Sequence, residues 1–160
     1  MRRFWFTSVL FLAALHRPAC ASTLGPIEAE INGLFKKVNP TVVTVRYSSG
    51  GKEFKEMVST GVIIDRNGHI IAVSHIPSES QTAQIVLSDG QERRAHLVGY
   101  DPESRIQVLK TEAQGLSCAE VGNPQEIETG NWVLIVGNSY GLSPSLSMGL
   151  ISGRRGDNLI

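Results

Sequence analysis

The chain has 160 residues, with 15 basic and 15 acidic side chains, a length that favours one domain or one domain and part of another. No charge excess points to nucleic acid or to a membrane surface, and the aromatic residues lack the basic interleaving typical of single-strand binders. The sequence therefore predicts no nucleic-acid partner.

Residues 1–21 have the pattern of a secretory signal peptide. Arg2 and Arg3 are followed by an uncharged apolar stretch over residues 4–15, and the segment ends with Ala19, Cys20 and Ala21. This pattern predicts cleavage after Ala21 and a periplasmic or secreted protein. The apolar stretch is shorter than the roughly 20 residues of a membrane span, so no stable span is expected.

An alternative interpretation makes Cys20 the acylated residue of a lipoprotein, but Arg17 and Pro18 fit that pattern poorly. After cleavage the chain would keep 12 basic and 15 acidic residues, a net charge of −3. It would also keep one cysteine, Cys118, so no internal disulfide is possible and Cys118 is interpreted as a small buried apolar residue.

Residues 22–40 form the expected N-terminal helical segment. Apolar residues recur at helical spacing over residues 26–38, and Asn39-Pro40 should end the helix.

Six short runs rich in β-branched residues follow, separated by turn sequences such as Asn67-Gly68 and Asp89-Gly90. Closely spaced strands without long helices between them predict a small antiparallel barrel or sandwich. The runs are residues 41–47, 58–65, 69–74, 83–89, 93–100 and 106–110.

A looser stretch over residues 111–130 precedes two further strand-like runs, 131–137 and 145–153. Two strands cannot close a barrel. We therefore expect a complete first barrel over residues 41–115, and over residues 116–160 a linker with the start of a second barrel.

Among the histidines, His75 stands out because it follows the apolar run IIAVS and precedes a polar loop. His69 and His96 are interpreted as structural or solvent-facing. No neighbouring His or Cys residues have metal-ligand spacing, and residues 137–141 lack the lysine of a phosphate-binding loop. The sequence predicts no metal and no cofactor.

The order of the motifs resembles the HtrA/Deg family of trypsin-like serine proteases over residues 38–153. The succession is STGVIID, RNG, HIIAVSHI, LSDG, VGYDPES, IQVLK, VGNPQEIETGNWVLIVGNSYGL and SMGLISG. The resemblance implies an all-β fold of two antiparallel trypsin-like β-barrels with the active site between them. It also implies that His75 is the catalytic base.

The chain departs from the family pattern close to this site. Ala72, Val73 and Ser74 stand where the family usually has Thr-Asn-Asn or Thr-Asn-Ala, and Pro77 replaces an aliphatic residue. The family motif Asp-Pro-x-x-Asp ends on the triad carboxylate, and here Arg105 stands in that place.

Neither nearby acid replaces the missing carboxylate well. Asp101 lies four residues away, roughly 13 Å along an extended chain. Glu103 would have to reach out of a turn. The family nucleophile lies in Gly-Asn-Ser-Gly-Gly, which these 160 residues do not contain, and Ser139 in GNSYG matches a position that is usually proline and is interpreted as a turn residue.

The expected function is that of an exported HtrA-like serine endopeptidase homologue that is inactive as it stands, since the Ser-His-Asp triad needs all three roles. Two alternatives remain open: a non-enzymatic scaffold that binds unfolded polypeptide or peptide segments, and a cropped sequence of an active endopeptidase. The resemblance also allows a homo-oligomer and a following PDZ domain.

Overall fold

The computed structural model describes residues 24–48, 56–73, 82–138, 144–156 and 158–159. The elements, in chain order, are α1 (Leu24–Val38), the 3₁₀ helix η1 (Asn39–Thr41), β1 (Val42–Ser48), β2 (Glu56–Ile63), β3 (His69–Val73), β4 (Thr82–Val86), β5 (Glu92–Asp101), β6 (Ile106–Thr111), the 3₁₀ helix η2 (Pro124–Glu126), β7 (Trp132–Gly137), β8 (Ser145–Leu150), β9 (Arg154–Arg155) and β10 (Asn158–Leu159).

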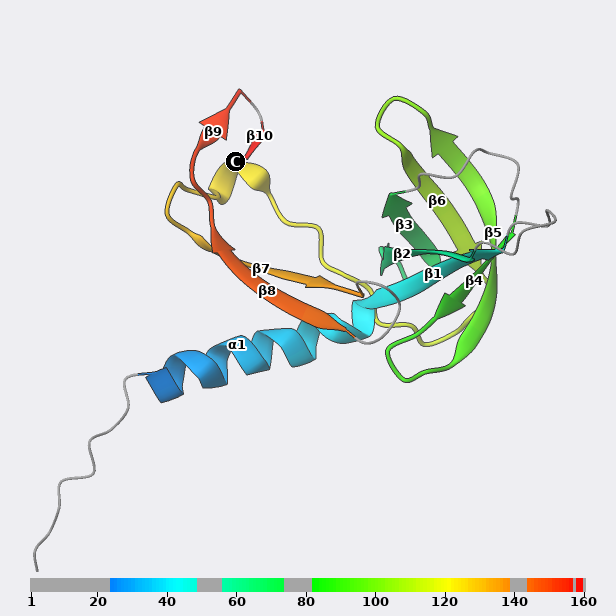
Figure 1. Ribbon diagram of the computed structural model, residues 1–160, viewed down its shortest axis with the longest axis horizontal. Coiled ribbons are helices and arrows are strands. Elements are labelled where there is room, and N and C mark those ends of the chain that lie inside the picture. Colours follow the sequence, from blue (N-terminus) through cyan, green and yellow to red (C-terminus); the bar gives the residue numbers. More distant parts are fainter. Residues whose placement is uncertain (1–23, 49–55, 74–81, 139–143, 157, 160) are drawn as a thin grey trace, which may run out of the picture.

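The expected N-terminal helix is α1, and none of its residues is fully buried. Lys36 and Lys37 lie in its last turn, where their charges interact favourably with the helix dipole. Pro40 lies in η1, which ends the helix and delays the first strand to Val42. Figure 1 shows α1 extending away from the barrel formed by β1 to β6 and passing near β7, with which it makes contact.

The six strands β1 to β6 close into an antiparallel barrel in the order β1-β2-β3-β6-β5-β4. Strand β1 joins the two ends of this order by pairing with both β2 and β4. The all-β class and the complete first barrel expected from the sequence are therefore confirmed.

The turn between β2 and β3 depends on Gly68. Its φ of +89° lies in the left-handed region that favours glycine, and a Cβ built there would lie 2.4 Å from the carbonyl oxygen of Thr111. The N–H of Thr111 donates to the carbonyl of Gly68 at 3.0 Å, so this turn is fastened to the end of β6. Strand β2 stops at Ile63, earlier than expected, because the turn begins at Asp65.

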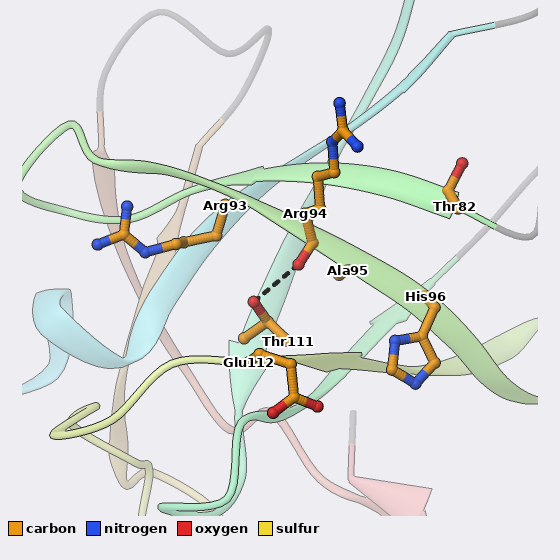
Figure 2. Close-up of a pocket in the computed structure, with 7 residues that line it drawn as sticks. All are labelled: Thr82, Arg93, Arg94, Ala95, His96, Thr111 and Glu112. Atoms are coloured by element: carbon orange, nitrogen blue, oxygen red, sulfur yellow. Dashed lines mark hydrogen bonds between the residues drawn. The ribbon is translucent and has the colours of Figure 1, made fainter.

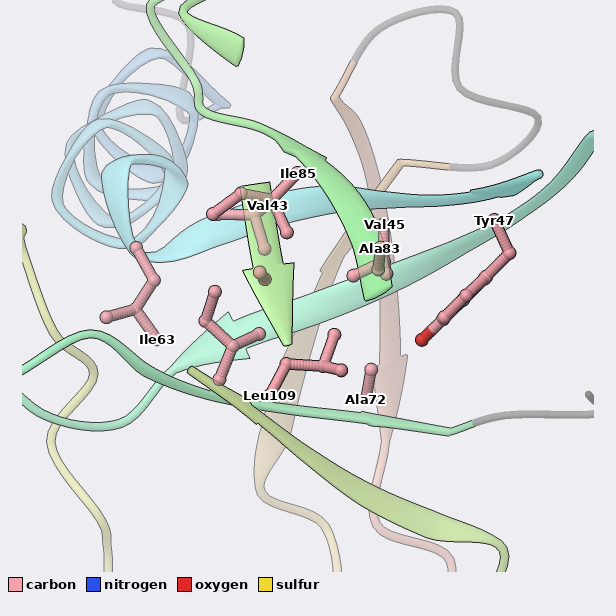
Figure 3. Packing of buried hydrophobic residues seen from close by; sticks show 10 residues of the cluster. Val43, Val45, Tyr47, Ile63, Ala72, Ala83, Ile85 and Leu109 are labelled. Atoms are coloured by element: carbon pink, nitrogen blue, oxygen red, sulfur yellow. The ribbon is translucent and has the colours of Figure 1, made fainter. Parts of the chain in front are cut away.

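The core fills the inside of the barrel with small and branched side chains (Figure 3). Ile63, Ile70 and Ile85 are fully buried, and Leu109 reaches the same cluster from β6. Cys118 is half-buried and packs against this core, beside the N–H of Ala119, which donates to the carbonyl of Ile63 at 2.8 Å. Burying apolar surface stabilises the folded state by roughly 25 cal/mol per Å², which makes this cluster the main source of stability.

The C-terminal elements form two separate two-stranded sheets, β7–β8 and β9–β10. Strand β8 ends at Leu150, three residues before the predicted end. Beyond it, Ile151 exchanges hydrogen bonds with the backbone of Gly130 and Asn131, which fixes the base of the hairpin. Both faces of β7–β8 expose large apolar side chains, among them Trp132, Ile135 and Met148.

Candidate functional site at the ends of strands β3 and β6

The turn that joins β5 to β6 is organised by Asp101. Its carboxylate accepts the N–H of Glu103 at 3.1 Å, the N–H of Ser104 at 3.3 Å and the hydroxyl of Ser104 at 2.5 Å. These hydrogen bonds, the Ser104 hydroxyl first among them, hold the pKa of Asp101 below its usual range. The carboxylate of Asp101 is therefore hydrogen-bonded within its own turn and, among the described residues, not to a neighbouring strand.

Arg105 closes this turn in an unusual backbone conformation. Its φ is 59°, and among the described residues it is the only non-glycine residue with a positive φ. A left-handed conformation costs an ordinary L-residue on the order of 1 kcal/mol. The side chain is exposed, and within the described ranges it makes no hydrogen bond or ion pair.

The strand register places Arg105 beside the end of β3. Ile106, the first residue of β6, lies directly opposite Val73, the last residue of β3. Arg105 precedes Ile106 by one residue and His75 follows Val73 by two, so the backbone of Arg105 is next to the point where the chain leaves β3 toward His75. His75 itself, Ser74 and Pro77 lie outside the described residues, as does Ser139.

A polar pair lies inside the barrel beneath this point. Gln107 is opposite Ala72 in the β3–β6 ladder, and its amide donates to the hydroxyl of Tyr47 on β1. Both side chains are buried, and burial raises the pKa of the Tyr47 hydroxyl. Sequence reasoning missed this pair, although a glutamine inside the apolar run IQVLK was a visible signal.

The end of β7 is joined to the first barrel through Asn138. Its backbone N–H donates to the hydroxyl of Thr60 at 3.0 Å, and its side-chain amide donates to the hydroxyl of Thr44. The segment GNSYG therefore begins against β1 and β2, on the side of the barrel that faces β7 (Figure 1).

The other histidines of the first barrel have different surroundings. His69 Nδ1 lies 2.6 Å from Asp65 Oδ2, and Asp65 also accepts the backbone N–H groups of Asn67 and His69. His96 is exposed on β5 and lines a surface pocket (Figure 2). No group of three or more His, Cys, Asp or Glu side chains in the described part of the chain could hold a metal ion.

No helix of the described residues is long and apolar enough to cross a membrane.

The comparison with known proteins gives consistent matches. A family model described as a trypsin-like peptidase domain matches residues 59–159. A probable periplasmic serine endoprotease DegP-like from Ectopseudomonas mendocina (strain ymp) is 32% identical over 114 residues, which is 71% of this chain and 24% of the relative. A protein of the same name from Pseudomonas fulva (strain 12-X) is 33% identical over 111 residues, 68% of this chain and 23% of the relative. The chain thus spans about a quarter of the length of these curated relatives.

Solved structures agree with the sequence matches. The HtrA-type protease AlgW with tripeptide superposes with a TM-score of 0.70 at 27% identity, covering 77% of this chain and 40% of that chain. The same protease with decapeptide gives a TM-score of 0.65 at 25% identity, covering 77% of this chain and 45% of that chain. On the matched domain, the sequence identity and the shared barrel, the chain belongs to the HtrA/Deg family of trypsin-like serine proteases.

Proposed function

We propose that this protein is an exported HtrA-like homologue that binds unfolded polypeptide or peptide segments without cleaving them. The observation that carries the proposal is the β3–β6 register, which sets Arg105 next to the end of β3. The family resemblance predicts that Arg105 stands at the triad carboxylate position. The proposed inactivity rests on this residue, whatever sequence follows Ile160.

The chemistry of the triad explains why a cation at this position is damaging. The carboxylate normally orients the imidazole and stabilises its charged form while the histidine holds the proton of the serine. A guanidinium near His75 would lower the pKa of the imidazole and offer no acceptor to fix its tautomer. Asp101 does not compensate, because its oxygens are used within the turn.

Two features support the binding and export parts of the proposal. HtrA-type neighbours of this chain have been solved with a tripeptide and with a decapeptide, which supports the proposal that this protein binds peptides. The relatives are named periplasmic, in keeping with the signal-peptide pattern of residues 1–21. Mass spectrometry of the exported protein should find Ser22 at the N-terminus, and an intact Met1 form confined to the cytoplasm would contradict export.

Hydrolysis of unfolded casein tests the role of Arg105. The protein itself should show no cleavage above background and no labelling by a serine-directed phosphonate. A fusion that carries a second barrel with Gly-Asn-Ser-Gly-Gly after Gly153 should have at most trace activity. The same fusion with Arg105→Asp should be faster by on the order of 10³–10⁴, the value of a triad carboxylate.

Circular dichroism of both fusions controls for folding. If both fold and the Arg105→Asp fusion is no faster, Arg105 does not occupy the carboxylate position. Labelling of any serine in the unmodified protein, Ser139 included, would overturn the proposed inactivity.

A further inference from the structure

The outer face of β3, β6 and β5 carries an exposed apolar strip. Residues in these strands alternate between core and surface, and Ile70, Ala72 and Leu109 point inward. Several of their outward neighbours are also apolar, which is unusual for the solvent side of a barrel. The apolar strip consists of Ile71, Val73, Val98, Ile106 and Val108.

The register makes the strip continuous. Val73 is opposite Ile106 and Ile71 is opposite Val108, so these four side chains form two adjacent rows across β3 and β6. On β5 the residue opposite Val108 is Gly99, which has no side chain, and Val98 occupies the irregularity beside it. Exposed fractions of 52% for Val73, 56% for Val98 and 40% for Ile106 show that the strip is open to solvent in the described structure.

The strip leads to a basic pocket one row further along the sheet. His96 on β5 is opposite Lys110 on β6, which is opposite His69 on β3. Beyond this row lies a pocket of about 410 Å³, lined by Thr82, Arg93, Arg94, His96, Thr111 and Glu112 (Figure 2).

The pocket holds positive charge that no carboxylate neutralises. Arg94 makes no side-chain hydrogen bond or ion pair with any described residue, and Arg93 donates to the backbone carbonyl of Glu92 and the side-chain carbonyl of Gln91. The only acid of the lining, Glu112, is 3.8 Å from the ammonium group of Lys110. Figure 2 shows the Arg93 and Arg94 side chains pointing in different directions, so a carboxylate of a bound segment would pair with one unneutralised guanidinium group, that of Arg94.

We propose that the apolar strip and the basic pocket together form a docking surface for an extended polypeptide segment with apolar side chains and a terminal acidic residue. Strand β6, from Ile106 to Thr111, spans roughly 17–20 Å, the length of about six extended residues. Alternate apolar side chains of such a segment cover the strip, and its carboxylate pairs with Arg94. This inference rests on the peptide-binding part of the proposed function and uses none of its catalytic residues.

The test is fluorescence anisotropy of the purified protein with two labelled peptides. The first is Val-Ser-Val-Ser-Val-Ser-Glu with an amidated C-terminus, and the second has Gln in place of Glu. Replacing both Val98 and Ile106 with Ser should weaken binding of either peptide about tenfold, because two apolar contacts are lost. Arg94→Gln should weaken binding of the Glu peptide about fivefold and leave the Gln peptide unchanged.

Val121→Ser is the matched control, because Val121 is 88% exposed and lies outside the strip. It should leave binding unchanged. The docking surface would be overturned if the Val98/Ile106 variant and the control had equal effects. It would also be overturned if the unsubstituted protein bound neither the Glu peptide nor the Gln peptide. Concentration-dependent self-association that the strip variants abolish would also overturn it, because the occupant would then be a second copy.

A separate measurement distinguishes this failure from failure of the proposed function. Labelled unfolded casein that binds the protein while the strip variants have no effect would refute only the docking surface. The fusion experiment on Arg105 is independent of both results.

Discussion

Gly68 shows how one residue fastens the β2–β3 turn to the end of β6. The carbonyl oxygen of Thr111 lies where a side chain would begin, and the backbone has a positive φ. Two separate penalties therefore oppose any substitution, since the turn must distort and the bond to β6 must lengthen.

Gly68→Ala should lower the free energy of unfolding by about 2 kcal/mol or more, from left-handed strain and displacement of β6. Gly90→Ala is the matched control, because Gly90 has a φ of +82° but open space around its Cβ position. It should cost about 1 kcal/mol. Urea unfolding followed by far-ultraviolet circular dichroism measures both, and equal losses would show that the contact with Thr111 is unimportant.

Asp65 makes the stability of the same turn depend on pH. Its hydrogen bonds to His69, first of all with the imidazole, hold the pKa of the carboxyl below its ordinary value of 3.8. A lowered pKa in the folded state means that the stabilisation is complete above the unfolded-state value and is lost as pH falls through the folded-state value.

Asp65→Asn should therefore reduce the dependence of unfolding free energy on pH at and below about pH 4. It should also destabilise the protein near neutral pH. Urea midpoints between acidic and neutral pH test this expectation, with Asp89→Asn as a control in another hairpin turn. An unchanged slope for Asp65→Asn would show that the unfolded state holds the same hydrogen bonds.

At the scale of elements, the buried Tyr47–Gln107 pair ties β1 to β6 across the barrel interior. Tyr47→Phe leaves the Gln107 amide buried without this partner and should cost about 1–3 kcal/mol. Adding Gln107→Leu removes the orphaned group, so the double variant should regain part of that loss. Thermal unfolding of Tyr47→Phe, Gln107→Leu and the double variant tests this, and additive losses would mean that the two side chains act independently.

The hairpin β7–β8 is held far less securely than the barrel. It pairs with no other sheet in the described residues, and a two-stranded ribbon is marginally stable by itself. Amide hydrogen exchange should be slow over residues 42–47 and fast over residues 132–137. Equal protection of the two strands would contradict this picture and indicate that another polypeptide covers the hairpin.

The sequence predicted individual strands and turns better than the pairing and contacts between them. Runs of β-branched residues and turns at Asn67-Gly68 and Asp89-Gly90 were enough to predict the barrel, because these signals are local. No local pattern shows that Val73 pairs with Ile106 across β3 and β6, or that β5 pairs with β6 through an irregularity between Leu97 and Gly99. The left-handed Arg105 was missed as well, and so was the buried Gln107, whose partner Tyr47 lies 60 positions away in the sequence.

For the whole molecule, the position of Arg105 follows from resemblance and register together. The family resemblance predicts that it stands at the carboxylate position, and the β3–β6 ladder places its neighbour Ile106 opposite the end of β3. Because His75 lies outside the described residues, the relation between the two side chains is a prediction that the fusion experiment addresses.

The closed barrel of β1 to β6 has a consequence for biogenesis. Every strand needed for closure lies between Val42 and Thr111, and the closing pair, β1 with β4, joins residues about 40 positions apart. In the proposed export, with the N-terminus leaving a translocation channel first, the whole barrel is available once Thr111 has passed. Folding of this unit can then begin before the rest of the chain arrives, and a folded unit outside the channel resists backward sliding.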